Sequence, residues 1–255
     1  MPSLNDLEQY LNTAGIASKK DNESTLSFAL SLPMFSGKRK AFELTATQSS
    51  SGLLIKESGG CLPNFCPNRH INMGGYFCLG FDIDGLPIHD WVSYIKEYLR
   101  AQEYVNKHRK WPKRVKEWSH GRAAYYQELV EQDLLKLRNN NISIDFKKIE
   151  LREVSPAKCY PYQPHYHLYY DSKLIATGTE ERILNKRASC ICIKDGSGKR
   201  RHKTVGNCKN QCSKILYQIP FNEKKRILEE NKFWDYFKGQ ECCKTMNDCK
   251  LNNNI

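Results

Sequence analysis

The sequence predicts an α+β protein with two domains, and three observations lead to this prediction. Apolar residues recur at helical spacing near the start of the chain, alternate as in half-buried strands between residues 25 and 56, and return to helical spacing after residue 88. The second half is rich in cysteine and basic residues. A chain of 255 residues can bury two modest cores. We place the boundary at the asparagine-rich turn after residue 138, which gives domains 1–138 and 142–255.

The first domain is expected to begin with a helix and an antiparallel meander. Residues 3–14 carry leucines at helical spacing after a Ser-Leu-Asn-Asp start that can cap a helix. Short alternating runs predict three strands, over residues 25–32, 41–47 and 53–56. Helices are expected at residues 88–104 and 119–137.

The second domain has weaker secondary-structure signals. Strand-like runs occupy residues 142–154, 165–170 and 174–176, and residues 227–236 predict a short closing helix. The run from Gly196 to Lys199 lacks the spacing of a phosphate-binding P-loop, so we predict no nucleotide site there.

Charge and hydropathy limit the partners and the compartment. Forty lysines and arginines against 28 acidic residues give a formal charge of +12, which favours acidic partners such as nucleic acid, an anionic surface or an acidic protein. No apolar run approaches the ~18 residues that span a bilayer, and the first residues do not resemble a signal peptide. We therefore expect a cytoplasmic protein without a membrane segment, in which most of the 11 cysteines are not in disulfides.

The segment from His70 to Leu79 is the strongest candidate for a catalytic site. Cys78 supplies a thiol, which is a strong nucleophile once ionised. Asn72 can donate a hydrogen bond to a developing oxyanion, and His70 could hold the turn that presents Asn72. The glycine pair between them and Cys78 permits a tight turn. The alternative is a buried strand cysteine preceded by two turn residues.

This order of residues resembles the ubiquitin-conjugating enzymes. The shared features are His-x-Asn, a glycine, an aromatic pair, Cys-Leu, a loop and then a helix that carries Trp91. The resemblance is to a divergent, bacterial branch, in which Ile71 stands where the family usually has proline and the interval from His70 to Cys78 is shorter. It covers residues 1–138.

The resemblance implies a role for each residue of the motif. Cys78 would carry the C-terminus of a ubiquitin-like protein as a thioester, Asn72 would steady the oxyanion during attack by the acceptor, and His70 would be structural. The partners implied are a ubiquitin-like protein, a ubiquitin-activating-like enzyme and an acceptor protein. The resemblance also implies a bacterial operon that encodes the activating enzyme, the ubiquitin-like protein and a deconjugating protease. Some operons of this kind are linked to defence against phage.

Two basic runs are candidates for contacts with nucleic acid or with an acidic protein. Residues 107–118 combine six cations with Trp111 and Trp118, a mixture that can follow a phosphate backbone and stack on bases. Residues 199–203 form a compact second run. The alternative for both is a solvated surface, with the tryptophans of the first run covering the core.

The cysteines of the second half predict a structural zinc site. Cys190 and Cys192 are separated by fifteen residues from Cys208 and Cys212, so two thiolate pairs on two turns can converge on one Zn²⁺. Unligated thiols are the alternative. Other residues could replace or join these ligands, namely Cys159, Cys242, Cys243, Cys249, His165 and His167.

Two further functions remain open. The missing proline and the short loop suggest a basic, zinc-stabilised binding module that keeps the fold without the reaction and binds nucleic acid or an acidic protein. A cysteine hydrolase would need a base in contact with Cys78, and His70 and His89 are the nearest histidines in the sequence.

Overall fold

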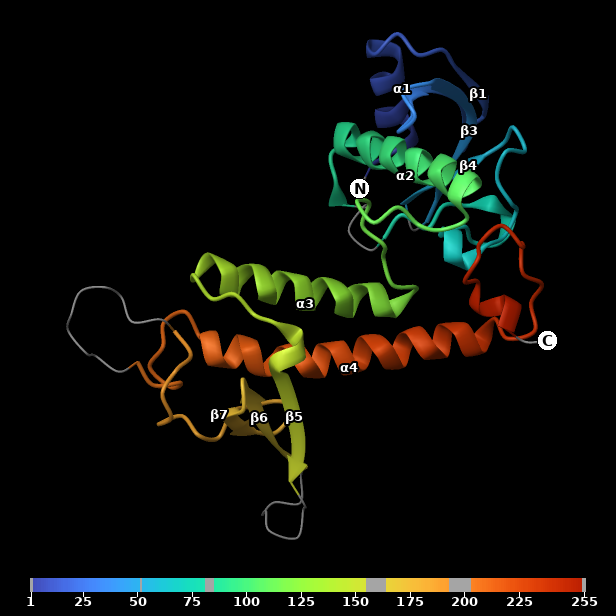
Figure 1. Cartoon of the computed structure of the whole chain (residues 1–255). Coiled ribbons are helices and arrows are strands. Elements are labelled where there is room, and N and C mark those ends of the chain that lie inside the picture. The colour runs from blue at the N-terminus through green and yellow to red at the C-terminus, as the bar shows by residue number, and fades with distance from the viewer. Residues whose placement is uncertain (1, 51, 81–84, 155–163, 193–202, 254–255) are drawn as a thin grey trace. The chain divides into compact units, whose positions relative to one another are not determined.

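The computed structural model describes residues 2–50, 52–80, 85–154, 164–192 and 203–253 (Figure 1). The chain forms two compact units: unit 1 comprises residues 1–120 and 231–255, and unit 2 comprises residues 121–230. The two compact units have other boundaries than the predicted domains, 1–138 and 142–255. The domain boundaries therefore stay a prediction. Cys159, the Gly196–Lys199 run and residues 199–202 of the second basic run lie outside the described residues.

Unit 1 is built on a four-stranded antiparallel meander. Its strands are adjacent in chain order and comprise β1 (Ser18–Asn22), β2 (Thr25–Pro33), β3 (Arg39–Ser49) and β4 (Gly52–Glu57). The predicted strands are all present, with slightly wider limits. Strand β1 was missed because its sequence, Ser-Lys-Lys-Asp-Asn, has no apolar residue. It is an edge strand that pairs with β2 through backbone hydrogen bonds.

The core of unit 1 lies between the sheet and two helices. Helix α1 (Leu4–Thr13) begins at a capping box, in which Ser3 and Asp6 bond to each other's backbone N–H groups. Helix α2 (Ile88–His108) continues four residues beyond its predicted end. The largest core side chains come from alternate positions of β2 and β3 and from the inner faces of these helices, and include Leu7, Leu11, Phe28, Leu30, Phe42, Leu44, Trp91, Ile95 and Leu99.

Unit 2 combines two helices with a three-stranded antiparallel sheet in the order β5-β6-β7. Its elements are α3 (Arg122–Asn139), β5 (Ile149–Val154), β6 (His165–Tyr170), β7 (Lys173–Gly178) and the unit 2 part of α4 (Cys212–Tyr236). The predicted strand over 142–154 forms only in its second half, because residues 146–148 make a 3-10 turn capped by Asp145.

The prediction of a short helix over residues 227–236 is wrong at its start, since α4 begins at Cys212. Pro220 lies inside this helix, where the missing N–H costs one helical hydrogen bond. Burial of Leu216, Tyr217 and Phe221 in the core of unit 2 offsets that cost.

The predicted α+β class is confirmed. Among the described residues, no helix has the length and apolar character needed to cross a membrane.

Candidate functional site

The loop that carries the predicted nucleophile begins with a closed turn. Cys66 and Ile71 exchange two backbone hydrogen bonds of 3.0 Å each, which closes the turn over residues 67–70. His70 ends this turn at φ 55°. The loop then folds back, because Ile71 pairs with Phe77 and the N–H of Phe77 donates to the carbonyl oxygen of Ile55 in β4, at 2.8 Å. The N–H of Cys78 donates to the carbonyl oxygen of His70 at 2.7 Å, so the predicted histidine and cysteine are neighbours.

Helix α2 holds this turn through buried polar contacts. Arg69 is 1% exposed, and its guanidinium donates to the side-chain oxygens of Gln102 (2.8 Å) and Asn106 (2.6 Å). The hydroxyl of Tyr98 donates to the carbonyl oxygens of Arg69 (3.0 Å) and His70 (2.9 Å). Burial raises the pKa of Tyr98 well above its usual value, so the hydroxyl stays protonated as a donor. Buried hydrogen bonds of this kind position a loop more rigidly than solvent-exposed ones.

Tyr98→Phe is expected to lower the free energy of unfolding by about 1–2 kcal/mol, because two carbonyl oxygens lose a donor but keep others from Gln102 and Cys78. Urea unfolding followed by tryptophan fluorescence measures this difference. An unchanged midpoint would show that the hydroxyl does not support the turn.

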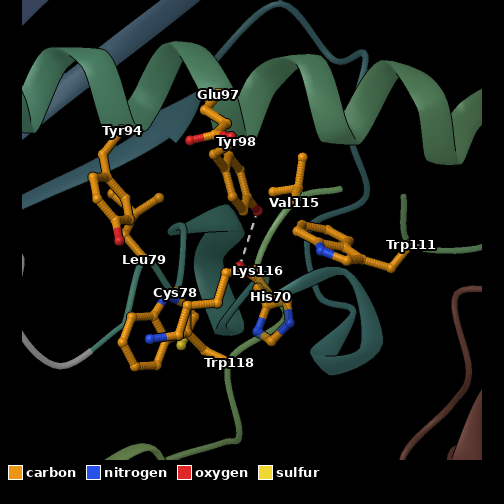
Figure 2. A pocket seen from close by; sticks show the side chains of 10 residues that line it. All are labelled: His70, Cys78, Leu79, Tyr94, Glu97, Tyr98, Trp111, Val115, Lys116 and Trp118. Atoms are coloured by element: carbon orange, nitrogen blue, oxygen red, sulfur yellow. Dashed lines mark hydrogen bonds between the residues drawn. The ribbon is translucent and has the colours of Figure 1, made fainter. Parts of the chain in front are cut away.

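Cys78 lies at a small pocket in unit 1 (Figure 2). The cavity has a volume of about 50 Å³, which is room for water-sized molecules rather than for a peptide. Cys78 is partly exposed. The pocket is lined by His70, Cys78, Leu79, Tyr94, Glu97, Tyr98, Trp111, Val115, Lys116 and Trp118. A larger ligand that reaches Cys78 must therefore lie across the opening.

The basic and aromatic segment 107–118 forms one side of this pocket, a role that the sequence did not reveal. Trp111 packs against the core of unit 1, in agreement with the alternative that the tryptophans cover the core. Trp118 is 9% exposed and packs on Gly80, where an added Cβ would come within 2.8 Å of the indole. Gly80 also has φ +101°, a conformation that favours glycine. The Nζ atom of Lys116 lies over the Trp118 ring, 3.1 Å from the ring centroid.

His70 occupies a structural position in the wall of the pocket. His70 is 3% exposed, and its ring stacks on His120 at 5.0 Å between centroids, with Trp111 edge-on at 5.1 Å. His89, the other histidine considered as a base, is exposed at the start of α2, where its Nε2 lies 3.2 Å from Asp90. His89 is not among the residues that line the pocket.

Asn72 does not line the pocket with Cys78. It is exposed, and its backbone N–H donates to the carbonyl oxygen of Tyr76 at 2.7 Å. It precedes a 3-10 turn without capping it through its side chain. The structure thus brings together Cys78 and His70, whereas Asn72 projects from the same loop towards solvent.

The four predicted metal ligands of unit 2 converge. The sulfur atoms of Cys190, Cys192, Cys208 and Cys212 all lie within 4.8 Å of one another. Cys190 and Cys192 follow a bridge between Ser189 and Thr204, and Cys212 is the first residue of α4. Individual separations are 3.4 Å for Cys190–Cys192 and 3.1 Å for Cys192–Cys208. Among the described residues, this quartet is the one group of three or more such side chains whose ligand atoms meet that limit.

The environment of the quartet favours ionisation of one thiol. Burial opposes the ionisation of Cys208, but N–H groups of Cys212 and Asn210 and a thiol contact with Cys192 lower its pKa to about 7. Burial raises the pKa values of Cys192 and Cys212. Four thiols this close become stable thiolates only when a cation compensates their charge, which is the chemistry of a metal centre.

The other residues considered as ligands do not belong to this quartet. Cys242, Cys243 and Cys249 cluster with Cys66 in unit 1. His165 and His167 lie on β6, at the positions that alternate with its buried residues. Cys159 is outside the described residues.

Comparison with known families agrees with this architecture. A family model described as a prokaryotic E2 domain, the class of ubiquitin-conjugating domains, matches residues 14–113. A model described as a cysteine-rich domain C-terminal to the E2 domain matches residues 119–251, more than half of the chain. No curated protein and no solved structure matches the chain at a significant level. The chain belongs to the prokaryotic E2-like family whose members carry a cysteine-rich domain C-terminal to the E2 domain.

Proposed function

We propose that this protein transfers a ubiquitin-like protein through a thioester on Cys78. The observation that carries the proposal is a partly exposed cysteine at a pocket, on a loop that backbone hydrogen bonds and α2 hold in place, within a chain of the E2-like family. The partners of the reaction are an activating enzyme that supplies the ubiquitin-like protein and an acceptor that receives it. Free thiols require a reducing compartment, which the cytoplasm provides.

The reaction consists of two acyl transfers. The Cys78 thiolate attacks the carbonyl carbon of the thioester on the activating enzyme; a new C–S bond forms, and the activating enzyme's thiolate leaves. An acceptor amine then attacks the carbonyl carbon held on Cys78. An amide bond forms, the Cys78 thiolate leaves, and the amine loses a proton to solvent. No oxidant and no cofactor is required for either step.

The other motif residues have distinct roles in this proposal. His70, whose ring stacks on His120 and meets Trp111 edge-on, positions the turn next to Cys78. Asn72 is the proposed oxyanion donor. Because it is exposed, the turn formed by Gly74 and Gly75, both at positive φ, must reorient when the substrate covers the pocket.

We further propose that the quartet in unit 2 holds structural Zn²⁺. A set of four thiolates suits a borderline-soft cation, and it leaves no open position for water, so the site is structural rather than catalytic. A metal would give the two turns that supply the ligands a defined conformation.

The thioester proposal is tested with the full chain, its activating enzyme, its ubiquitin-like protein and ATP. We expect an adduct on non-reducing gels that disappears on treatment with excess thiol and is not formed by Cys78→Ala. Cys61→Ala is the matched control, because Cys61 is an exposed cysteine of the same unit. An adduct that persists in Cys78→Ala would contradict the proposal.

The alternative of a nucleic-acid-binding module rests on charge alone. Trp111 and Trp118 face the pocket and contact His70 and Lys116, so their rings are not displayed for stacking on bases. The formal charge of +12 still favours an acidic partner, and an acidic surface on the ubiquitin-like protein or the activating enzyme would satisfy it.

A further inference from the structure

A second group of cysteines lies in unit 1, close to the loop that carries Cys78. We call it the C-terminal thiol cluster; it consists of Cys66, Cys242, Cys243 and Cys249. Cys66 and Cys249 are each 1% exposed, and the other two pack against the same small core. The sulfur atoms of Cys66 and Cys243 lie 2.7 Å apart although 177 residues separate them in the chain.

We propose that the C-terminal thiol cluster is a second metal site, which binds a thiophilic divalent cation such as Zn²⁺. The site differs from the quartet in unit 2, since all four of its residues belong to unit 1. Its consequence is structural: a bound cation would tie the last segment of the chain to the turn that precedes His70.

Hydrogen-bond donors beside two of the sulfur atoms support the proposal. The N–H of Lys244 donates to the sulfur atom of Cys242 at 3.3 Å, and the hydroxyl of Thr245 lies 3.0 Å from the sulfur atom of Cys243. Such donors stabilise negative charge on sulfur, and thiolates are the metal-binding form of cysteine.

The buried charge of Arg69 supports an anionic cluster rather than a disulfide. In the described part of the chain, the guanidinium bonds to the amide oxygens of Gln102 and Asn106, and it forms no salt bridge with a carboxylate. Burial lowers the pKa of Arg69, and negative charge on Cys66 or Cys243 would oppose that effect. Four thiolates around one divalent cation carry a net charge of about −2, which compensates Arg69. A Cys66–Cys243 disulfide would be neutral and would leave that charge unbalanced.

The distances define what closure around a cation requires. A sulfur separation of 2.7 Å is longer than the ~2.05 Å of a disulfide and shorter than the ~3.8 Å edge of a tetrahedral zinc site. Cys66 and Cys243 must therefore move apart by about 1 Å, while Cys242 and Cys249 rotate towards them. The four sulfur atoms do not all lie within 4.8 Å of one another, so this rotation is part of the proposal.

The C-terminal segment already contacts the elements that this site would join. In Figure 1 it lies beside the turn at residues 66–71. Asn68 donates to the carbonyl oxygen of Asp248 at 3.1 Å, and Asn247 donates its N–H to the carbonyl oxygen of Arg109 at 2.9 Å. The segment is irregular and buries few apolar side chains, among them Met246 and Leu251. A metal is a common means of stabilising such a segment.

The test is the zinc content of the full chain purified without chelator. We expect about two zinc ions per chain in the wild type, because each of two four-thiolate sites binds one. Cys243→Ser/Cys249→Ser should fall to one, Cys208→Ser/Cys212→Ser should also fall to one, and Cys61→Ser should keep both. As a measurement that needs no variant, titration of metal-free wild-type protein with Co²⁺ should raise the thiolate-to-cobalt absorption band up to two equivalents.

Three results would overturn the proposal. The first is a wild type with one zinc, all of which is lost in Cys208→Ser/Cys212→Ser. The second is a cobalt titration that saturates at one equivalent. The third is a mass deficit of two hydrogen atoms with Cys66 and Cys243 in one cross-linked peptide, which would identify a disulfide.

Discussion

Cys208→Ser is expected to unfold unit 2. The side chain is 5% exposed, contacts Cys192 at 3.1 Å and lies in the quartet beside the start of α4. Structural Zn²⁺ sites contribute ~10–16 kcal/mol of binding free energy to folding, as much as the ~5–15 kcal/mol by which a typical domain is stable. Losing one thiolate ligand should therefore remove most of the stability of the unit.

Zinc content together with thermal unfolding followed by circular dichroism measures this effect. We expect the variant to lose the zinc of the quartet and a large part of its helical signal, because α3 and α4 share the core of unit 2. Cys61→Ser should unfold like the wild type, since Cys61 is exposed. If Cys208→Ser kept the melting temperature and the metal content of the wild type, the quartet would not be a structural metal site.

Cys78→Ser should change the chemistry of the adduct rather than remove it entirely. Serine would form an oxygen ester, which resists thiols and is cleaved by hydroxide. The hydroxyl ionises much less readily than the thiol, so loading should slow by about 100-fold or more, and transfer to an amine should slow with it because an alkoxide is the poorer leaving group.

Single-turnover assays with and without excess thiol measure both changes. Cys61→Ser is the control that alters an exposed thiol of the same unit, and it should load and discharge like the wild type. If Cys78→Ser were loaded at the wild-type rate and thiol still cleaved its adduct, the acyl group would be on another cysteine.

The parts of the fold that could be predicted are those in which local sequence and burial agree. The alternation of Phe28 and Leu30 in β2 puts both side chains in the core, and Ser3 begins α1 with the capping box that its sequence indicates. The unit 2 quartet followed from two cysteine pairs near each other in the chain. His70 and Cys78 are neighbours because one short loop carries both.

The parts that could not be predicted depend on contacts between distant segments. Cys66 and Cys243 meet across 177 residues, and no spacing rule connects them. Trp118 looked like part of a basic surface segment, but packing on Gly80 places it at the pocket. Arg69 is buried because α2 supplies amide oxygens that accept its hydrogen bonds. The loop sequence around Arg69 gives no sign of these partners, because they lie more than 30 positions later in the chain.

The central claim is that Cys78 carries the acyl group, and the most direct measurement is peptide mapping of the wild-type adduct under non-reducing conditions. The chain is loaded with its ubiquitin-like protein, digested at mildly acidic pH and analysed by mass spectrometry. Our account predicts the C-terminal glycine of the ubiquitin-like protein on the peptide that contains Cys78, and its release by thiol. Attachment at any other cysteine, or a Cys78 that stays unmodified while the adduct forms, would contradict it.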